Sequence, residues 1–309
     1  MSTPATDWSQ QGRGRRHPAS LWTYRTGSPL CRLDLGIESG EIAISTDDGH
    51  LHLLGTDGSL RHPPRPLDAR AALDWTDVAT GGVVQIGPKS AAWVDHDLEV
   101  QWSVDVHTDI LDVATSPFGN AIAISLADAH TFVLDAQQQR CGEFTTSRPL
   151  QHIHFVPQRR AIVGTADSGM LCSHRLDGRE RWTEQIWRNV GDLAVNGNGR
   201  TILLAAFNHG VQSFTARGRS HGFFDIEGTV HLVSISYVGT ILTAATREQQ
   251  LYLLDIDGSI LWQATLPEPL ATLRCGPLGE HILCGFSSGL VECLRWPPWP
   301  RHKVEADDD

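Results

Sequence analysis

The fold is decided by the stretch Leu254-Asp255-Ile256-Asp257-Gly258-Ser259-Ile260-Leu261-Trp262. An apolar run leads into Asp-Gly, and this glycine supplies the positive φ that a tight hairpin turn requires. A second run follows and ends on tryptophan, which offers a large apolar surface. The stretch Arg175-Leu176-Asp177-Gly178-Arg179-Glu180-Arg181-Trp182 has the same order. Both stretches therefore predict a strand, a tight turn and a second strand anchored by tryptophan.

The tryptophans of these stretches belong to a regular series: Trp22, Trp102, Trp182 and Trp262. Their spacing is 80 residues, and the half-steps fall in the same local context, so the repeat is 40 residues long. The slots in between hold His62, Gly142 and Gly222. Tryptophan makes up only 10 of the 309 residues, so four in seven slots is far above chance. A 40-residue period of short strands is typical of the blades of a β-propeller.

A second column lies eleven residues after each tryptophan slot and is apolar in every repeat: Leu33, Leu73, Val113, Ile153, Leu193, Val233 and Leu273. Its neighbours alternate with polar residues, which is the periodicity of a strand. The runs are short, punctuated by glycine and rich in Val, Ile and Thr, which argues against two-helix repeats. The sequence predicts an all-β protein, a seven-bladed β-propeller of four-stranded blades. We call the strands of a blade a to d from the centre outward.

The last repeat ends after strand c, because Trp296-Pro297-Pro298-Trp299-Pro300 cannot pair as a central strand. Residues 17–24 align with residues 257–264 instead, so the N-terminal segment is expected to supply strand d of the last blade and close the ring. The predicted boundaries are a flexible N-terminal tail at 1–16, a single propeller domain at 17–296, and a Pro-rich, then acidic tail at 297–309.

Composition limits the partners. Asp and Glu number 36 against 25 Lys and Arg, a formal charge of −11, which argues against nucleic acid as a partner. No apolar run is long enough to span a membrane, and residues 1–16 contain no apolar segment of a signal peptide. The six cysteines form no Cys-x-x-Cys pair and are expected to be reduced thiols. These features favour a cytoplasmic protein without membrane insertion; its oligomeric state stays open.

The run Asp255–Trp262, with the weaker copy at Asp177–Trp182, resembles the repeat of quinoprotein-like propellers, the superfamily of pyrroloquinoline-quinone dehydrogenases and outer-membrane assembly scaffolds. The resemblance covers nearly the whole chain at the level of the repeat. WD-repeat propellers are the second likeness, although their Gly-His and Trp-Asp dipeptides are absent from the repeat slots. The enzymes of the first superfamily have eight blades and ligands for calcium and quinone, and no residue here matches those ligands, so no cofactor is expected.

Polar residues recur in strand a, which lines the central channel. They are Arg32, Asp34, Asp74, Asp112, His152, His154, Asp192 and Arg274. One interpretation is an axial site for a small ligand or a divalent metal, since imidazole and carboxylate are metal ligands. The other is a ring of groups that satisfy one another around a wet channel. The second interpretation is preferred, and the metal is left unknown.

The d–a and b–c loops share one face of a propeller. Seven residues are expected there and form a candidate protein-interaction face: Trp187, Arg188, Phe207, His209, Phe286, Arg25 and Arg148. Aromatic and arginine side chains on loops have the composition of an interaction hot spot. Packing of Trp187 on Phe207 within adjacent loops is the simpler alternative.

No set of residues forms a catalytic signature. Gly285-Phe286-Ser287-Ser288-Gly289 matches the Gly-x-Ser-x-Gly pattern, but that motif needs a strand that turns into a helix, and a b–c hairpin is expected here. The sequence therefore favours a non-catalytic propeller that acts as a scaffold for protein partners or as a subunit of a larger complex. The alternative is a propeller that binds a small ligand or metal through the polar residues of its channel, with enzymatic activity left open.

Overall fold

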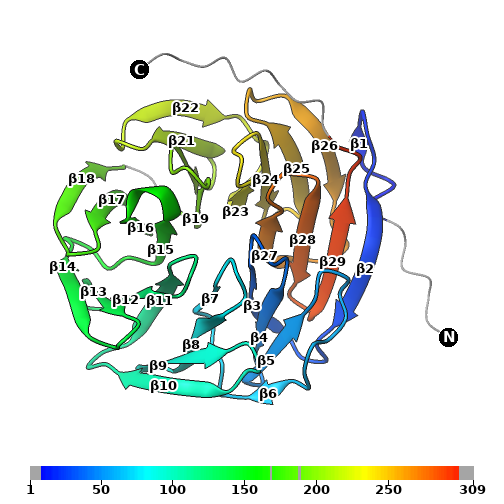
Figure 1. Cartoon of the computed structure of the whole chain (residues 1–309). Coiled ribbons are helices and arrows are strands. Elements are labelled where there is room, and N and C mark those ends of the chain that lie inside the picture. Colours follow the sequence, from blue (N-terminus) through cyan, green and yellow to red (C-terminus); the bar gives the residue numbers. More distant parts are fainter. Residues whose placement is uncertain (1–7, 168, 187–188, 299–309) are drawn as a thin grey trace.

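The computed structural model describes residues 8–167, 169–186 and 189–298. Seven antiparallel sheets surround a central channel in a closed ring (Figure 1). This confirms the predicted all-β, seven-bladed propeller. No helix in the described part of the chain is long and apolar enough to cross a membrane.

Each blade contains four strands in the order a to d. The a strands are β3 (Leu30–Leu35), β7 (Leu73–Trp75), β11 (Ile110–Thr115), β15 (His152–Val156), β19 (Asp192–Val195), β23 (Val230–Ile235) and β27 (Leu270–Cys275). The b strands are β4 (Ile42–Thr46), β8 (Gly81–Gly87), β12 (Ala121–Leu126), β16 (Ala161–Ala166), β20 (Thr201–Ala205), β24 (Ile241–Thr246) and β28 (His281–Phe286). The c strands are β5 (His50–Leu54), β9 (Ser90–Asp95), β13 (His130–Asp135), β17 (Met170–Arg175), β21 (Val211–Thr215), β25 (Gln250–Asp255) and β29 (Leu290–Arg295). The d strands are β6 (Arg65–Pro66), β10 (Val100–Asp105), β14 (Arg140–Thr145), β18 (Glu180–Gln185), β22 (Ser220–Phe224), β26 (Ile260–Thr265) and β2 (Ala19–Arg25).

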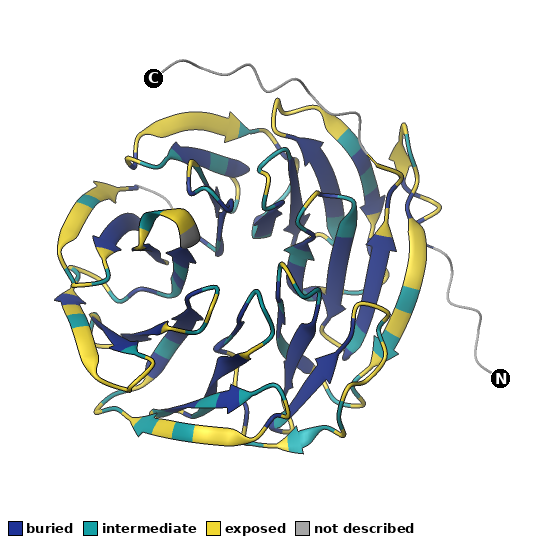
Figure 2. Cartoon of the chain, viewed as in Figure 1, coloured by how far each residue is buried: buried dark blue, intermediate teal, exposed yellow. Residues whose placement is uncertain are grey.

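The core lies between the blades. The b and c strands are buried on both faces, and every residue of β12 is buried. The d strands form the exposed rim of the ring (Figure 2). Seven apolar clusters fill the seven gaps between neighbouring blades. Apolar side chains on both faces of each sheet explain why the blades must pack side by side rather than stand alone.

The repeated tryptophan and the repeated Asp-Gly turn meet across a blade interface. Trp22 on β2 packs on the c–d turn of the next blade, where a Cβ at Gly58 would collide with the indole ring. Its Nε1–H donates to the carbonyl of Thr56 at 3.0 Å. Trp182 packs on Gly218 in the same way, with its Nε1 3.0 Å from the carbonyl oxygen of Ala216. Glycine at these two turns adopts a positive φ and leaves the space that the indole ring occupies.

The predicted closure by the N-terminal segment is confirmed. Strand β2 pairs antiparallel with β29, from Ala19 opposite Arg295 to Arg25 opposite Leu290. Figure 1 shows β2, in blue, beside β29, in red. The ring therefore has one non-covalent seam, which runs between these two strands.

The predicted start of the fold at residue 17 is wrong, because residues 8–16 pack on the ring. Strand β1 (Arg13–Gly14) pairs with β26 and gives the sixth blade a fifth strand. Trp8 is 8% exposed, and its Nε1–H donates to Oε2 of Glu292 at 2.9 Å. The N-terminal segment thus contacts both the sixth blade and the seam strand β29. Trp8 lies outside the repeat, so the 40-residue pattern gave no signal for this contact.

The C-terminal boundary falls mainly on residues that are not described. The carbonyl of Pro298 accepts a hydrogen bond from Nη1 of Arg16 at 2.6 Å, which holds the end of the last blade near the N-terminal segment. Residues 299–309 of the predicted acidic tail lie outside the described residues, as do residues 1–7.

Candidate functional site

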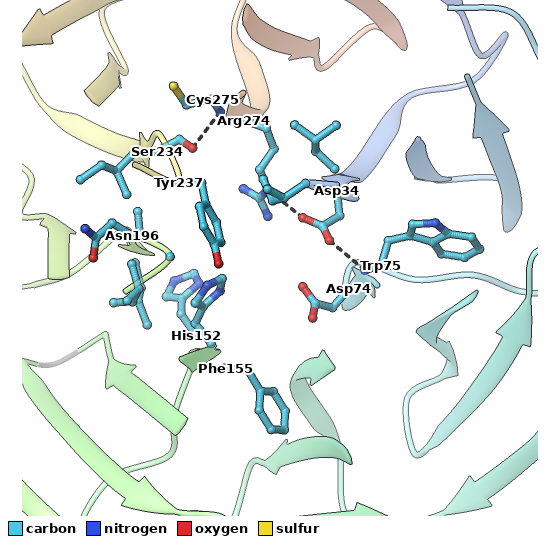
Figure 3. Close-up of a pocket in the computed structure, with 18 of the residues that line it drawn as sticks. Asp34, Asp74, Trp75, His152, Phe155, Asn196, Ser234, Tyr237, Arg274 and Cys275 are labelled. Atoms are coloured by element: carbon cyan, nitrogen blue, oxygen red, sulfur yellow. Dashed lines mark hydrogen bonds and ion pairs between the residues drawn. The ribbon is translucent and has the colours of Figure 1, made fainter. Parts of the chain in front are cut away.

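The polar a-strand residues converge on one cavity in the channel. All eight predicted axial residues line it, and its volume is about 120 Å³. Figure 3 shows Asp34 and Asp74 from one side of the ring and His152 from another, all directed inward. A cavity of this size and polarity has room for water molecules or a small ligand.

Most of the acidic side chains form hydrogen bonds that link neighbouring blades, and we call these bonds ties. An a-strand side chain accepts a hydrogen bond from the backbone N–H one repeat plus one residue later, so each pair spans 41 positions. The pairs are Asp34 to Trp75 (2.8 Å), Asp74 to Thr115 (2.6 Å), Asp112 to Ile153 (2.9 Å), Asp192 to Val233 (3.1 Å) and Ser234 to Cys275 (2.9 Å). A short acceptor at this position satisfies a backbone N–H that faces the channel and belongs to the next sheet.

The seam side of the channel has an ion pair as well. Nε of Arg274 lies 2.9 Å from Oδ1 of Asp34, and both side chains are largely buried. Burial acts to lower the pKa of Arg274, but the carboxylates of Asp34 and Asp192 outweigh it and raise that pKa. Arg274 therefore links the last blade to Asp34 of the first blade. Asp34 in turn accepts a hydrogen bond from Trp75 of the second blade.

Burial changes the charge of the channel. It raises the pKa of Asp74 well above its usual value, and the neighbouring Asp34 carboxylate adds to this effect. It also raises the pKa of Asp112, and it raises the pKa of Asp77 to about 6. Burial therefore favours the neutral form of these carboxyl groups over the charged form.

The histidines lie on β15, which donates to Asp112 of the preceding blade through the N–H of Ile153. His152 and His154 take the two inward positions of this strand. Within the described residues, no side chain of β15 accepts a hydrogen bond of the 41-residue kind from the next blade. Burial lowers the pKa of His154 to about 4, so its imidazole is neutral at pH 7. Among the residues that the structure describes, neither histidine is grouped with two further ligand side chains. In the described part of the chain, such groups occur at His62–His96–Asp97 and at His107–Asp128–His130.

A wider cavity of about 620 Å³ forms the channel mouth on the face of the d–a and b–c loops. Arg32 lines both this mouth and the inner cavity, and its Nε is buried without a hydrogen-bond partner. Nδ1 of His231, which also lines the mouth, is likewise buried and unpartnered. The guanidinium of Arg247 lies over the ring of Phe207, 5.2 Å from its centroid. Asp112 and Asp167 also line the mouth, and the charge of Arg32 acts to lower the pKa of Asp112. The two arginines and the two unpartnered nitrogen atoms therefore suit an anionic group that binds beside these carboxyl groups.

The residues of the predicted interaction face differ in exposure. His209, Arg25 and Arg148 are exposed, whereas Phe207 is half-buried beneath Arg247. Trp187 and Arg188 lie outside the described residues.

The placement of Phe286 on this face is wrong. Phe286 is the last residue of β28, is 0% exposed, and packs edge-on against Trp8. Strand alternation turns its side chain inward, since the hairpin itself begins one residue later. The Gly-x-Ser-x-Gly match forms the tight turn between β28 and β29, as expected, with Gly289 at φ +91°.

Arg247 and His231 were missed by the sequence analysis, although Arg247 had a signal. It stands 40 residues after Phe207, in the same b–c loop position of the next blade. Both residues therefore reach the same rim of the channel mouth.

Because comparison with known proteins gives no match, any function must be argued from the features of the channel and its mouth. The chain matches no protein-family model, and no curated protein matches it.

Proposed function

We propose that this propeller is a non-catalytic binding protein and that its channel mouth holds an acidic segment of a protein partner. The observation that carries the proposal is Arg32. Its Nε is buried without a partner at the mouth, and no described acidic side chain lies within ion-pair distance of it. A guanidinium whose Nε is buried and unpartnered gains a charge-assisted hydrogen bond when a carboxylate arrives.

The surroundings of Arg32 support a carboxylate on a protein segment. Arg247 and Phe207 form an aromatic and arginine pair on the rim, of the kind found in interaction hot spots. The mouth is about 620 Å³, which is large enough for a side chain and part of its backbone. Exposed His209 and Arg148 lie on loops of the same face.

The ties in the channel support a scaffold rather than a catalyst. Asp34, Asp74, Asp112 and Asp192 each accept a backbone hydrogen bond from a neighbouring blade. This use fixes the ring and presents a rigid face, so binding there requires little ordering of the propeller.

The proposal includes two finer points. The repeat resembles that of quinoprotein-like propellers, whose superfamily contains assembly scaffolds, with WD-repeat propellers as the second likeness. Six free cysteines, four of them buried, fit a reducing compartment, and we infer a cytoplasmic location.

A second candidate is a small anionic ligand bound deeper in the channel, since Arg32 also faces the inner cavity beside His152 and His154. Screening the purified protein against phosphate and small dicarboxylates by thermal shift separates the candidates. A ligand that raises the melting temperature of the wild type but not of Arg32→Gln would favour the small-ligand function.

The proposed function is tested by isolating the protein from its own cells and measuring the native mass of what it carries. We expect a stoichiometric partner with the wild type, and loss of that partner with Arg32→Gln or Arg247→Ala. Arg200→Gln is the matched control, because exposed Arg200 lies in an a–b turn on the opposite face. A partner that remains bound to Arg32→Gln, or a wild-type chain that is isolated without one, would contradict the proposal.

A further inference from the structure

The interface between the first and second blades lacks a tryptophan anchor. Its slot is His62, which lies just before the two-residue strand β6. The c–d turn of the second blade faces this slot and places His96 and Asp97 there. Asp97 stands in the aspartate position of the Asp-Gly turns of the first, fourth and sixth blades. The rings of His62 and His96 lie edge to face, with centroids 5.5 Å apart.

Three ligand atoms converge at this point. Nε2 of His62 lies 3.6 Å, and Nδ1 of His96 4.0 Å, from the same oxygen, Oδ1 of Asp97. Two ligands bound tetrahedrally to one zinc ion are about 3.4 Å apart. The three groups are therefore near ligand spacing but too far apart for normal hydrogen bonds to one another.

The geometry around the three atoms fits metal binding better than pairing among the side chains. Nε2 of His62 is buried and has no hydrogen-bond partner. Nε2 of His96 lies 3.0 Å from Oε1 of Glu41, and the side chain of Glu41 is 10% exposed. A carboxylate that accepts from one imidazole nitrogen fixes the tautomer and leaves the other nitrogen free as a ligand. Glu41 thus holds Nδ1 of His96 toward Asp97.

We propose that His62, His96 and Asp97 bind one zinc ion that joins the first blade to the second. The two imidazoles and the carboxylate supply three protein ligands, and water supplies the fourth. The ion would stand where Trp22 and Trp182 stand at their own interfaces. An ion pair between Arg65 and Glu99 crosses the same interface beside it.

The second histidine cluster is a natural control. Nε2 of His107 and Nδ1 of His130 lie 2.5 Å and 3.1 Å from the same oxygen of Asp128, and all three residues are exposed. These groups already satisfy one another, so a metal ion would have to break their contacts.

The test is calorimetric titration of Zn²⁺ into protein purified without an affinity tag. We expect one saturable site in the wild type. His62→Ala and Asp97→Asn each abolish it, Glu41→Gln weakens it about 10–100-fold through loss of the positioning carboxylate, and His130→Ala leaves it unchanged. Asp97→Asn keeps the shape of an exposed side chain, so its effect cannot be attributed to misfolding.

The melting temperature gives the second readout. Zn²⁺ should raise it in the wild type and in His130→Ala, but not in His62→Ala. Absence of saturable binding would overturn the inference, and so would a site that survives His62→Ala or is lost in His130→Ala. Because these residues lie on the rim between two blades, failure here leaves the proposed binding at the channel mouth untouched.

Discussion

Replacement of Trp8 by alanine should destabilise the protein strongly, although this residue precedes the repeats. Trp8 is 8% exposed and lies between Trp262 and Phe286, with a ring-centroid distance of 6.1 Å to each. Truncation of a buried tryptophan to alanine costs about 3–5 kcal/mol in the free energy of unfolding. The substitution also removes the donor to Oε2 of Glu292, a residue that is 8% exposed, and an unpaired buried acceptor costs about 1–3 kcal/mol.

Urea unfolding of matched variants separates these contributions. Trp8→Phe keeps most of the apolar contact but loses the donor, so its loss should be about 1–3 kcal/mol. Phe223→Ala is the control, because Phe223 is 66% exposed on a d strand and its loss should stay near 0.5 kcal/mol, roughly the range of surface substitutions. A protein lacking residues 1–16 should lose at least as much stability as Trp8→Ala. If both changes leave the urea midpoint where it was, residues 8–16 behave as the flexible tail that the repeat pattern suggested, and the reasoning is refuted.

Three further predictions concern the ring. Asp34→Ala should lower the free energy of unfolding by about 3–5 kcal/mol in urea, because it leaves Arg274 without its counter-charge. Ser234→Ala removes only a hydrogen bond and should lower it by about 1–3 kcal/mol. Equal losses in the two variants would refute the special role of the ion pair. His154 has a pKa near 4 in the folded state and an ordinary one of 6.5, so the unfolded chain binds the extra proton between these values. Its contribution to stability is complete above pH 6.5 and falls by up to about 3 kcal/mol as the pH drops to 4; His154→Gln should flatten this part of the stability–pH curve, and an unchanged slope would count against a neutral buried imidazole. Trp22→Ala should cost more than Trp102→Ala, because Trp22 also donates to Thr56 at the blade beside the seam, and equal urea midpoints would refute this.

The repeat was readable from the sequence because its signals are local. Asp-Gly in the turn, tryptophan in strand d and an apolar residue in strand a each reflect a requirement inside one 40-residue unit. The alignment of residues 17–24 with 257–264 carried the same information to the other end of the chain and placed strand β2 correctly.

The remaining features depend on contacts between units. Asp34 and Trp75 look unrelated in sequence, and only the packed ring shows that one carboxylate receives the N–H of the next a strand. In the sequence, His62 is only a position of the repeat that lacks tryptophan. Its contacts with His96 and Asp97 cannot be read from the repeat, because those two residues belong to a turn of the next blade. Knowing that each anchor contacts the next blade's turn would have brought these three residues together from sequence alone.

The most direct test of the central claim is to place a photo-reactive cross-linking amino acid at position 209, on the loop face that carries the channel mouth, and at position 200 on the opposite face. After irradiation in the protein's own cells, the cross-linked peptide is identified by mass spectrometry. The account predicts that position 209 captures a partner peptide containing Asp or Glu, that Arg32→Gln abolishes this product, and that position 200 captures no such peptide. Equal capture at both positions, or a product at position 209 that survives Arg32→Gln, would contradict it.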